Sequence, residues 1–72
     1  QTYLIKQMKF IFKEPKIYYR KFDLFQNSWI DLFLDRSEEE IIKSMHPNLE
    51  NKLERVETLE NGKKTFTLIW ES

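Results

Sequence analysis

The stretch VETLENGKKTFTLIW, residues 56–70, decides the fold because it contains the strongest hairpin signal in the chain. Asn61 and Gly62 tolerate the positive φ angles of a type I′ turn, and apolar and polar residues alternate after them. We therefore predict an antiparallel hairpin in which Thr58 faces Thr65 and Val56 faces Thr67. One face of the last strand is expected to be buried through its large apolar residues, Phe66, Leu68 and Trp70.

The segment before this turn also admits a helical interpretation. Four apolar residues follow a helical spacing, namely Leu49, Leu53, Val56 and Leu59. In that case Gly62 would end the helix at the position after its C-cap. The hairpin is the favoured interpretation, and a helix over residues 49–59 is its alternative.

A short helix is predicted to begin at Ser37. Ser37 and Glu40 form a Ser-x-x-Glu capping box, in which each side chain accepts a hydrogen bond from a backbone N–H of the other residue. The carboxylates of residues 38–40 complement the positive end of the helix dipole. The helix needs a sheet to cover its apolar stripe of Ile41, Ile42 and Met45, and Pro47 is expected to end it.

Three further strands are predicted ahead of this helix, at residues 3–12, Ile17–Phe25 and Trp29–Leu34. A helix over residues 23–35 is an alternative for part of this region. The fold class is therefore α+β: a small antiparallel sheet in the order β-β-β-α-β-β, with one short helix packed on one face. A β-grasp-like arrangement is a neighbouring variant, and this analogy carries no function with it.

Length and composition limit the architecture. Seventy-two residues form a single domain, residues 1–72, and no cysteine is present to cross-link it. No apolar run approaches the length of a membrane span, so we expect no membrane partner. The absence of cysteine fits a reducing compartment, and we expect a cytoplasmic protein. The chain begins at Gln1 rather than Met, so we expect a domain excised from a longer chain, a processed chain or a trimmed one.

Charge is sorted along the sequence although the formal net charge is zero. Residues 1–21 carry six basic residues and one acid, and residues 22–40 carry one basic residue and six acids. Seven of the eleven aromatic residues fall among the first 25 positions, interleaved with the basic residues. This segment is a candidate surface for a polyanion, unless the acidic residues pair with it inside the fold.

No catalytic, metal-binding or cofactor-binding motif is recognisable. His46 is the only histidine, and no cysteine or second histidine accompanies it at the spacing of a metal site. Asp31 and Asp35 on one strand would stand about 13 Å apart, which is too far to share a proton. Gly62 alone cannot form a phosphate-binding loop. We therefore expect a protein that is not an enzyme and needs no cofactor or metal.

The remaining signal is the aromatic and basic density around the second predicted strand. The candidate binding surface consists of Tyr18, Tyr19, Arg20, Lys21 and Trp29. Tyr, Trp and Arg are the residues enriched at the energetic centres of protein interfaces. We expect a non-catalytic module for protein–protein interaction or self-association. Binding of single-stranded nucleic acid or another polyanion through the N-terminal strands is the alternative.

Overall fold

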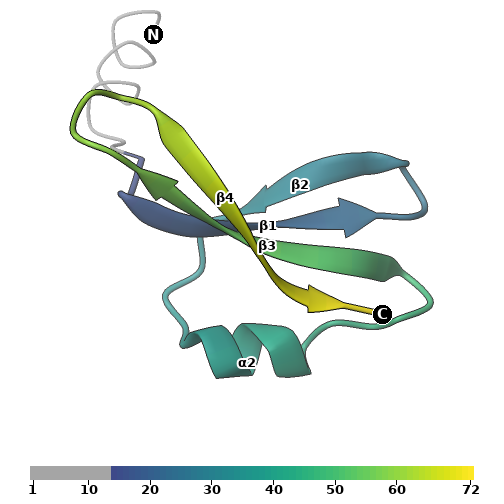
Figure 1. Ribbon diagram of the computed structural model, residues 1–72. Coiled ribbons are helices and arrows are strands. Elements are labelled where there is room, and N and C mark those ends of the chain that lie inside the picture. Colours follow the sequence, from purple (N-terminus) through teal and green to yellow (C-terminus); the bar gives the residue numbers. More distant parts are fainter. Residues whose placement is uncertain (1–13) are drawn as a thin grey trace, which may run out of the picture.

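The structure is a computed structural model that describes residues 14–72 (Figure 1). Its elements run in the order β-β-α-β-β. They are β1 (Ile17–Asp23), β2 (Ser28–Leu32), α2 (Glu38–Lys43), β3 (Glu50–Thr58) and β4 (Lys64–Glu71). This order agrees with the last five elements of the prediction. The expected strand at residues 3–12 lies outside the described residues.

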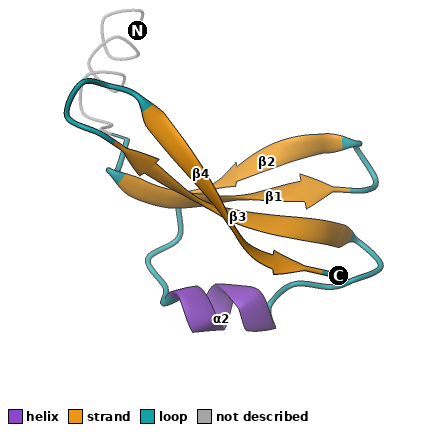
Figure 2. Cartoon of the chain, in the orientation of Figure 1, coloured by secondary structure: helices purple, strands orange, loops and turns teal. Residues whose placement is uncertain are grey.

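The four strands form one antiparallel sheet in the order β2-β1-β3-β4, and α2 lies on one side of it (Figure 2). An antiparallel sheet with one short helix is therefore confirmed for residues 14–72. Both helical alternatives are wrong, because residues 23–35 contain β2 and residues 49–59 contain β3. Each of those segments is paired through its backbone with a neighbouring strand, and this pairing outweighs its helical spacing.

The turn between β1 and β2 begins at Asp23, two residues earlier than predicted. The Asp23 carboxylate accepts hydrogen bonds from the backbone N–H groups of Phe25 at 2.7 Å and Gln26 at 3.1 Å. Asn27 completes the turn with a φ of 56°, a conformation that asparagine tolerates better than most residues. These local bonds end β1 and leave Phe25 in the turn instead of in the strand.

The hairpin between β3 and β4 is confirmed, but its predicted register is wrong by one residue. Thr58 faces Lys64 and Val56 faces Phe66. The Gly62 N–H donates to the Leu59 carbonyl at 2.9 Å, and Gly62 has a φ of 87°. Asn61 does not have a positive φ, so the turn is a type I turn followed by a glycine bulge and not type I′. The longer loop brings Phe66 onto the same face as Val56.

Helix α2 begins as predicted at Ser37. The Ser37 hydroxyl accepts from the Glu40 N–H at 3.2 Å, and the Glu40 carboxylate accepts from the Ser37 N–H at 3.2 Å. The helix ends at Lys43 with Ser44 as its C-cap, three residues before Pro47. Ile41 is the fully buried residue of the helix and lies against the sheet. No helix within residues 14–72 has the length and apolar character needed to cross a membrane.

The capping box makes a prediction about stability. Replacing Ser37 with alanine removes the acceptor for the Glu40 N–H, so the free energy of unfolding should fall by about 1 kcal/mol. Urea unfolding at neutral pH measures this loss. Ser37→Thr keeps the hydroxyl and should retain most of the stability, and equal losses in both variants would contradict the role of the cap.

The same cap predicts a pH dependence. Hydrogen bonds from the backbone and hydroxyl of Ser37 lower the pKa of Glu40 below its usual value of 4.5. Because the folded pKa is lowered, this contribution is present above pH 4.5 and is lost as the pH falls through the lowered pKa. The stability gap between the wild type and Ser37→Ala should therefore narrow in acid. A gap that is constant or widens in acid would contradict this.

The hairpin turn makes a separate prediction. A Cβ at Gly62 would meet nothing within 4 Å, so Gly62→Ala loses stability only through its backbone conformation, by about 1–2 kcal/mol. Asn61→Ala loses only the acceptor for the Lys63 N–H and should cost about 0.5–1 kcal/mol. Thermal unfolding of both variants compares the costs. An Asn61→Ala cost as large as that of Gly62→Ala would favour the type I′ turn.

Candidate functional site

The side chains of the sheet divide between two faces, because directly paired residues of neighbouring strands share a face. The face toward α2, here the helix face, carries Tyr19, Lys21, Leu53, Arg55 and Trp70. The opposite face, here the aromatic face, carries Tyr18, Arg20, Phe22, Trp29, Phe66 and Leu68. Helix α2 lies over the helix face and not over the aromatic face, so the side chains of the two faces have different surroundings.

On the helix face, the Glu38 carboxylate joins the start of α2 to the sheet. It accepts hydrogen bonds from the Tyr19 hydroxyl at 3.2 Å and from Arg55 Nη1 at 2.9 Å. Burial raises the pKa of Tyr19, and the hydrogen bond to Glu38 raises it further. The same carboxylate raises the pKa of Arg55. Tyr19 and Arg55 are thus used to hold the helix in place.

Glu50 makes the second connection on the helix face. It is 4% exposed, and its carboxylate accepts from Lys21 Nζ at 3.1 Å and from the His46 N–H at 3.0 Å. A buried carboxylate requires such partners, since an unpaired charge is costly to desolvate. His46 takes part through its backbone, because its carbonyl also accepts hydrogen bonds from the N–H groups of Leu49 and Glu50 at 2.8 Å. His46 therefore shapes the loop that leads into β3.

The centre of the aromatic face is a guanidinium held between two rings. The Arg20 guanidinium lies 4.1 Å from the ring centre of Trp29 and 3.9 Å from that of Phe66. Its Nε donates to the Glu54 carboxylate at 2.7 Å. Phe22 packs edge-on against Trp29 at 5.3 Å between ring centres. Arginine suits this position because its planar group stacks on rings while its edge still donates hydrogen bonds.

The edge of this face carries apolar side chains in contact with solvent. Phe66 is 47% exposed and Leu68 is 48% exposed. The sequence pattern predicted that both would be buried, and that expectation is wrong. They lie on β4, which has a neighbouring strand on one side only among residues 14–72, and on the face opposite α2. An exposed apolar patch beside fixed aromatic rings is typical of a contact surface.

A second group of rings lies where β1 begins. The Tyr18 ring packs against Phe33 with 4.9 Å between ring centres. Lys64 Nζ lies 5.1 Å from the centre of the Tyr18 ring, donates to the Tyr18 hydroxyl at 2.9 Å, and forms an ion pair with Glu14. The Glu14 carboxylate, followed by the Tyr18 hydroxyl, raises the pKa of Lys64. The charge of Lys64 is therefore fixed and internally matched.

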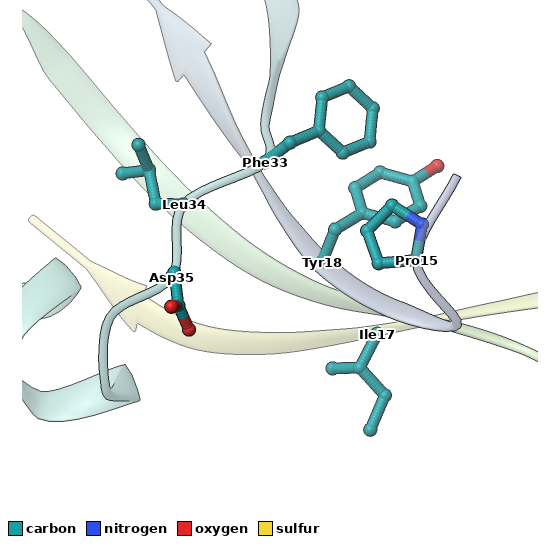
Figure 3. Close-up of a pocket in the computed structure, with 6 residues that line it drawn as sticks. All are labelled: Pro15, Ile17, Tyr18, Phe33, Leu34 and Asp35. Atoms are coloured by element: carbon teal, nitrogen blue, oxygen red, sulfur yellow. The ribbon is translucent and has the colours of Figure 1, made fainter. Parts of the chain in front are cut away.

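A pocket of about 250 Å³ opens beside this group (Figure 3). It lies between the start of β1 and the segment that follows β2. Its lining presents polar as well as apolar surface and consists of Pro15, Ile17, Tyr18, Phe33, Leu34 and Asp35. Pockets that enclose cofactors or drug-sized ligands measure about 300–1,000 Å³, so this one is better matched to a single side chain of a partner.

The structure separates the five residues of the predicted binding surface. Tyr18, Arg20 and Trp29 share the aromatic face, whereas Tyr19 and Lys21 lie on the helix face and bind carboxylates there. Four of the five predicted residues, Tyr18 to Lys21, are consecutive in sequence, and successive residues of a strand point to opposite faces. Phe66 and Leu68, which the sequence analysis had placed in the core, lie on the same face as Tyr18, Arg20 and Trp29.

The candidate metal-binding and carboxylate residues of the sequence are His46, Asp31 and Asp35. Within residues 14–72 no three His, Cys, Asp or Glu side chains are grouped so that they could hold a metal ion. Asp31 lies on β2, while Asp35 lies beyond the end of that strand and lines the pocket. A search of family models, curated proteins and solved structures finds no match to this chain. Its function is therefore inferred from the geometry of the aromatic face.

The stacked arginine makes a testable prediction. Arg20→Lys keeps a positive charge near Glu54 but loses the planar contact with Trp29 and Phe66, so the free energy of unfolding should fall by about 1–2 kcal/mol. Chemical unfolding measures the loss, and Arg36→Lys in the segment before α2 is the matched control. If the two variants were equally stable, the stack would contribute nothing.

Proposed function

We propose that this chain is a non-catalytic module that binds another protein through the aromatic face. The observation that carries the proposal is the half-exposed pair Phe66 and Leu68 beside the stack of Arg20 between two rings. Interfaces concentrate their binding energy in a few aromatic and arginine residues that sit among apolar neighbours. The aromatic face has this composition.

The rigidity of the surface also favours binding. Arg20 is held by two rings and one carboxylate, and Trp29 is packed by Phe22. Side chains that are already ordered lose little conformational entropy when a partner binds. The pocket beside Tyr18 adds a recess for one partner side chain. The Asp35 carboxylate in its lining suits a side chain that ends in a cation or a hydrogen-bond donor.

Binding of single-stranded nucleic acid or another polyanion is the alternative function, and the charge distribution weakens it. Several bases are matched by carboxylates within the fold, in the pairs Arg20–Glu54, Lys21–Glu50, Arg55–Glu38 and Lys64–Glu14. The full chain contains twelve Lys and Arg against twelve Asp and Glu, a formal charge of zero. A surface that neutralises phosphates needs free basic side chains.

Site-specific photo-crosslinking tests the proposal. A benzophenone amino acid at Phe22 reports on the aromatic face, and the same group at Phe25, which is 92% exposed in the turn, is the matched control. In extracts of the source cells we expect a discrete protein adduct from position 22 and none from position 25. Trp29→Ala in the position-22 protein should reduce the adduct by about tenfold or more.

Adducts that form equally at both positions, or that ignore Trp29→Ala, would contradict the proposal. The alternative is tested by titrating single-stranded oligonucleotides in fluorescence anisotropy at low and high salt. We expect no binding at low ionic strength. Binding that weakens steeply with salt would favour the polyanion function instead.

A further inference from the structure

The outer edge of β4 is the longest edge of the sheet that no strand covers among residues 14–72. The sheet ends at β2, which has five residues, and at β4, which has eight. Residues 65–70 of β4, TFTLIW, contain no charge, glycine or proline. An apolar edge of this kind is a template for adding another strand. We propose that β4 pairs antiparallel with β4 of a second copy of this chain.

The backbone groups available for such pairing follow from the hairpin. Leu59 donates its N–H to the Lys63 carbonyl at 2.7 Å, so this pair is hydrogen-bonded across β3 and β4. Bonded and non-bonded pairs alternate along an antiparallel ladder. Thr65 and Thr67 therefore direct their backbone groups to β3, whereas Phe66 and Leu68 direct theirs away from the sheet.

A two-fold axis then restricts the register. In a symmetric antiparallel pair one residue must face its own copy, and outward-directed residues must face one another. Centring the pair on Thr67 places Phe66 opposite Leu68 of the second copy on the aromatic face. Centring it on Phe66 would instead place Lys64 opposite Leu68. The Thr67-centred register is therefore favoured, because it matches apolar with apolar and Thr with Thr.

The charges at the ends of β4 support the same register. Ile69 is an extra residue in the ladder, because Leu68 faces Glu54 and Trp70 faces Leu53. This bulge shortens β4 by about one residue, which brings Glu71 of the second copy level with Lys64. Glu71 of the second copy then lies beside Lys64, whose Nζ also binds Glu14 and Tyr18 of its own chain, and a second copy repeats this contact by symmetry.

The pairing would extend the sheet to eight strands and join the two aromatic faces into one surface. This inference rests on the proposed protein-binding function, because it names a second copy of the chain as one partner. The contact it describes uses the edge of β4 and not the aromatic face. Its failure is therefore separable from that of the proposed function. A monomer that still gives the Phe22 adduct leaves the protein-binding proposal standing.

Cysteine cross-linking tests the register in a chain that has no cysteine of its own. Thr67→Cys places two thiols opposite each other, about 4.5 Å apart between Cα atoms, within the range of a disulfide. Thr65→Cys is the matched control, since its two copies would lie about 13 Å apart. We expect rapid disulfide dimers from Thr67→Cys alone. Equal rates at both positions would overturn the proposal.

Charge reversal gives an independent readout by sedimentation of the full chain. Glu71→Lys should weaken self-association by about tenfold, because like charges then meet beside Lys64 at both ends of the paired strands. Glu60→Lys makes the same change of charge in the hairpin loop, outside the paired segment, and is the matched control. Circular dichroism checks that both variants remain folded. A wild-type chain that stays monomeric up to millimolar concentration, or a Glu71→Lys variant that dimerises as the wild type does, would refute the proposal.

Discussion

The domain depends on β3 being paired along both of its edges. It lies between β1 and β4 in the sheet, and it supplies one fully buried side chain to each face. Leu53 faces α2 and Val56 faces the opposite side, because residues three apart on a strand point in opposite directions. Ile41 of α2 is likewise fully buried. A sheet of this size has few such residues, so the loss of either β3 side chain would weaken one whole face.

The two faces use polar groups for different purposes. On the helix face, Glu38 and Glu50 accept hydrogen bonds from side chains of the sheet and from the loop that follows α2. These bonds fix a six-residue helix that could not form alone. On the aromatic face the charged group of Arg20 is stacked between rings, while Phe66 remains half exposed. The polar groups of the helix face are thus satisfied within the fold, whereas the aromatic face leaves apolar surface in contact with solvent.

Local chemistry was readable from the sequence, but long-range pairing was not. The cap at Ser37 was predicted and found, whereas Asn-Gly at the hairpin fits two turn types that differ by one residue in register. The buried residues of β3 recur at every third position because Leu53 is buried on one face of the sheet and Val56 on the other, and this spacing resembles the apolar stripe of a helix. Tyr18, Arg20 and Trp29 were selected by residue type, but the stack of Arg20 on Phe66 depends on β3 lying between their strands. The order of the strands in the sheet cannot be derived from a local pattern of the sequence.

Amide hydrogen exchange by NMR tests the central claim most directly, namely that among residues 14–72 the sheet is covered by α2 on its helix face and uncovered at the outer edge of β4. At low protein concentration, the account predicts slow exchange along β3 and fast exchange at Phe66 and Leu68. At high concentration those two amides should become protected while Thr65 and Thr67 change little. Slow exchange at Phe66 and Leu68 in dilute protein would show that the edge is already covered, which would contradict the account.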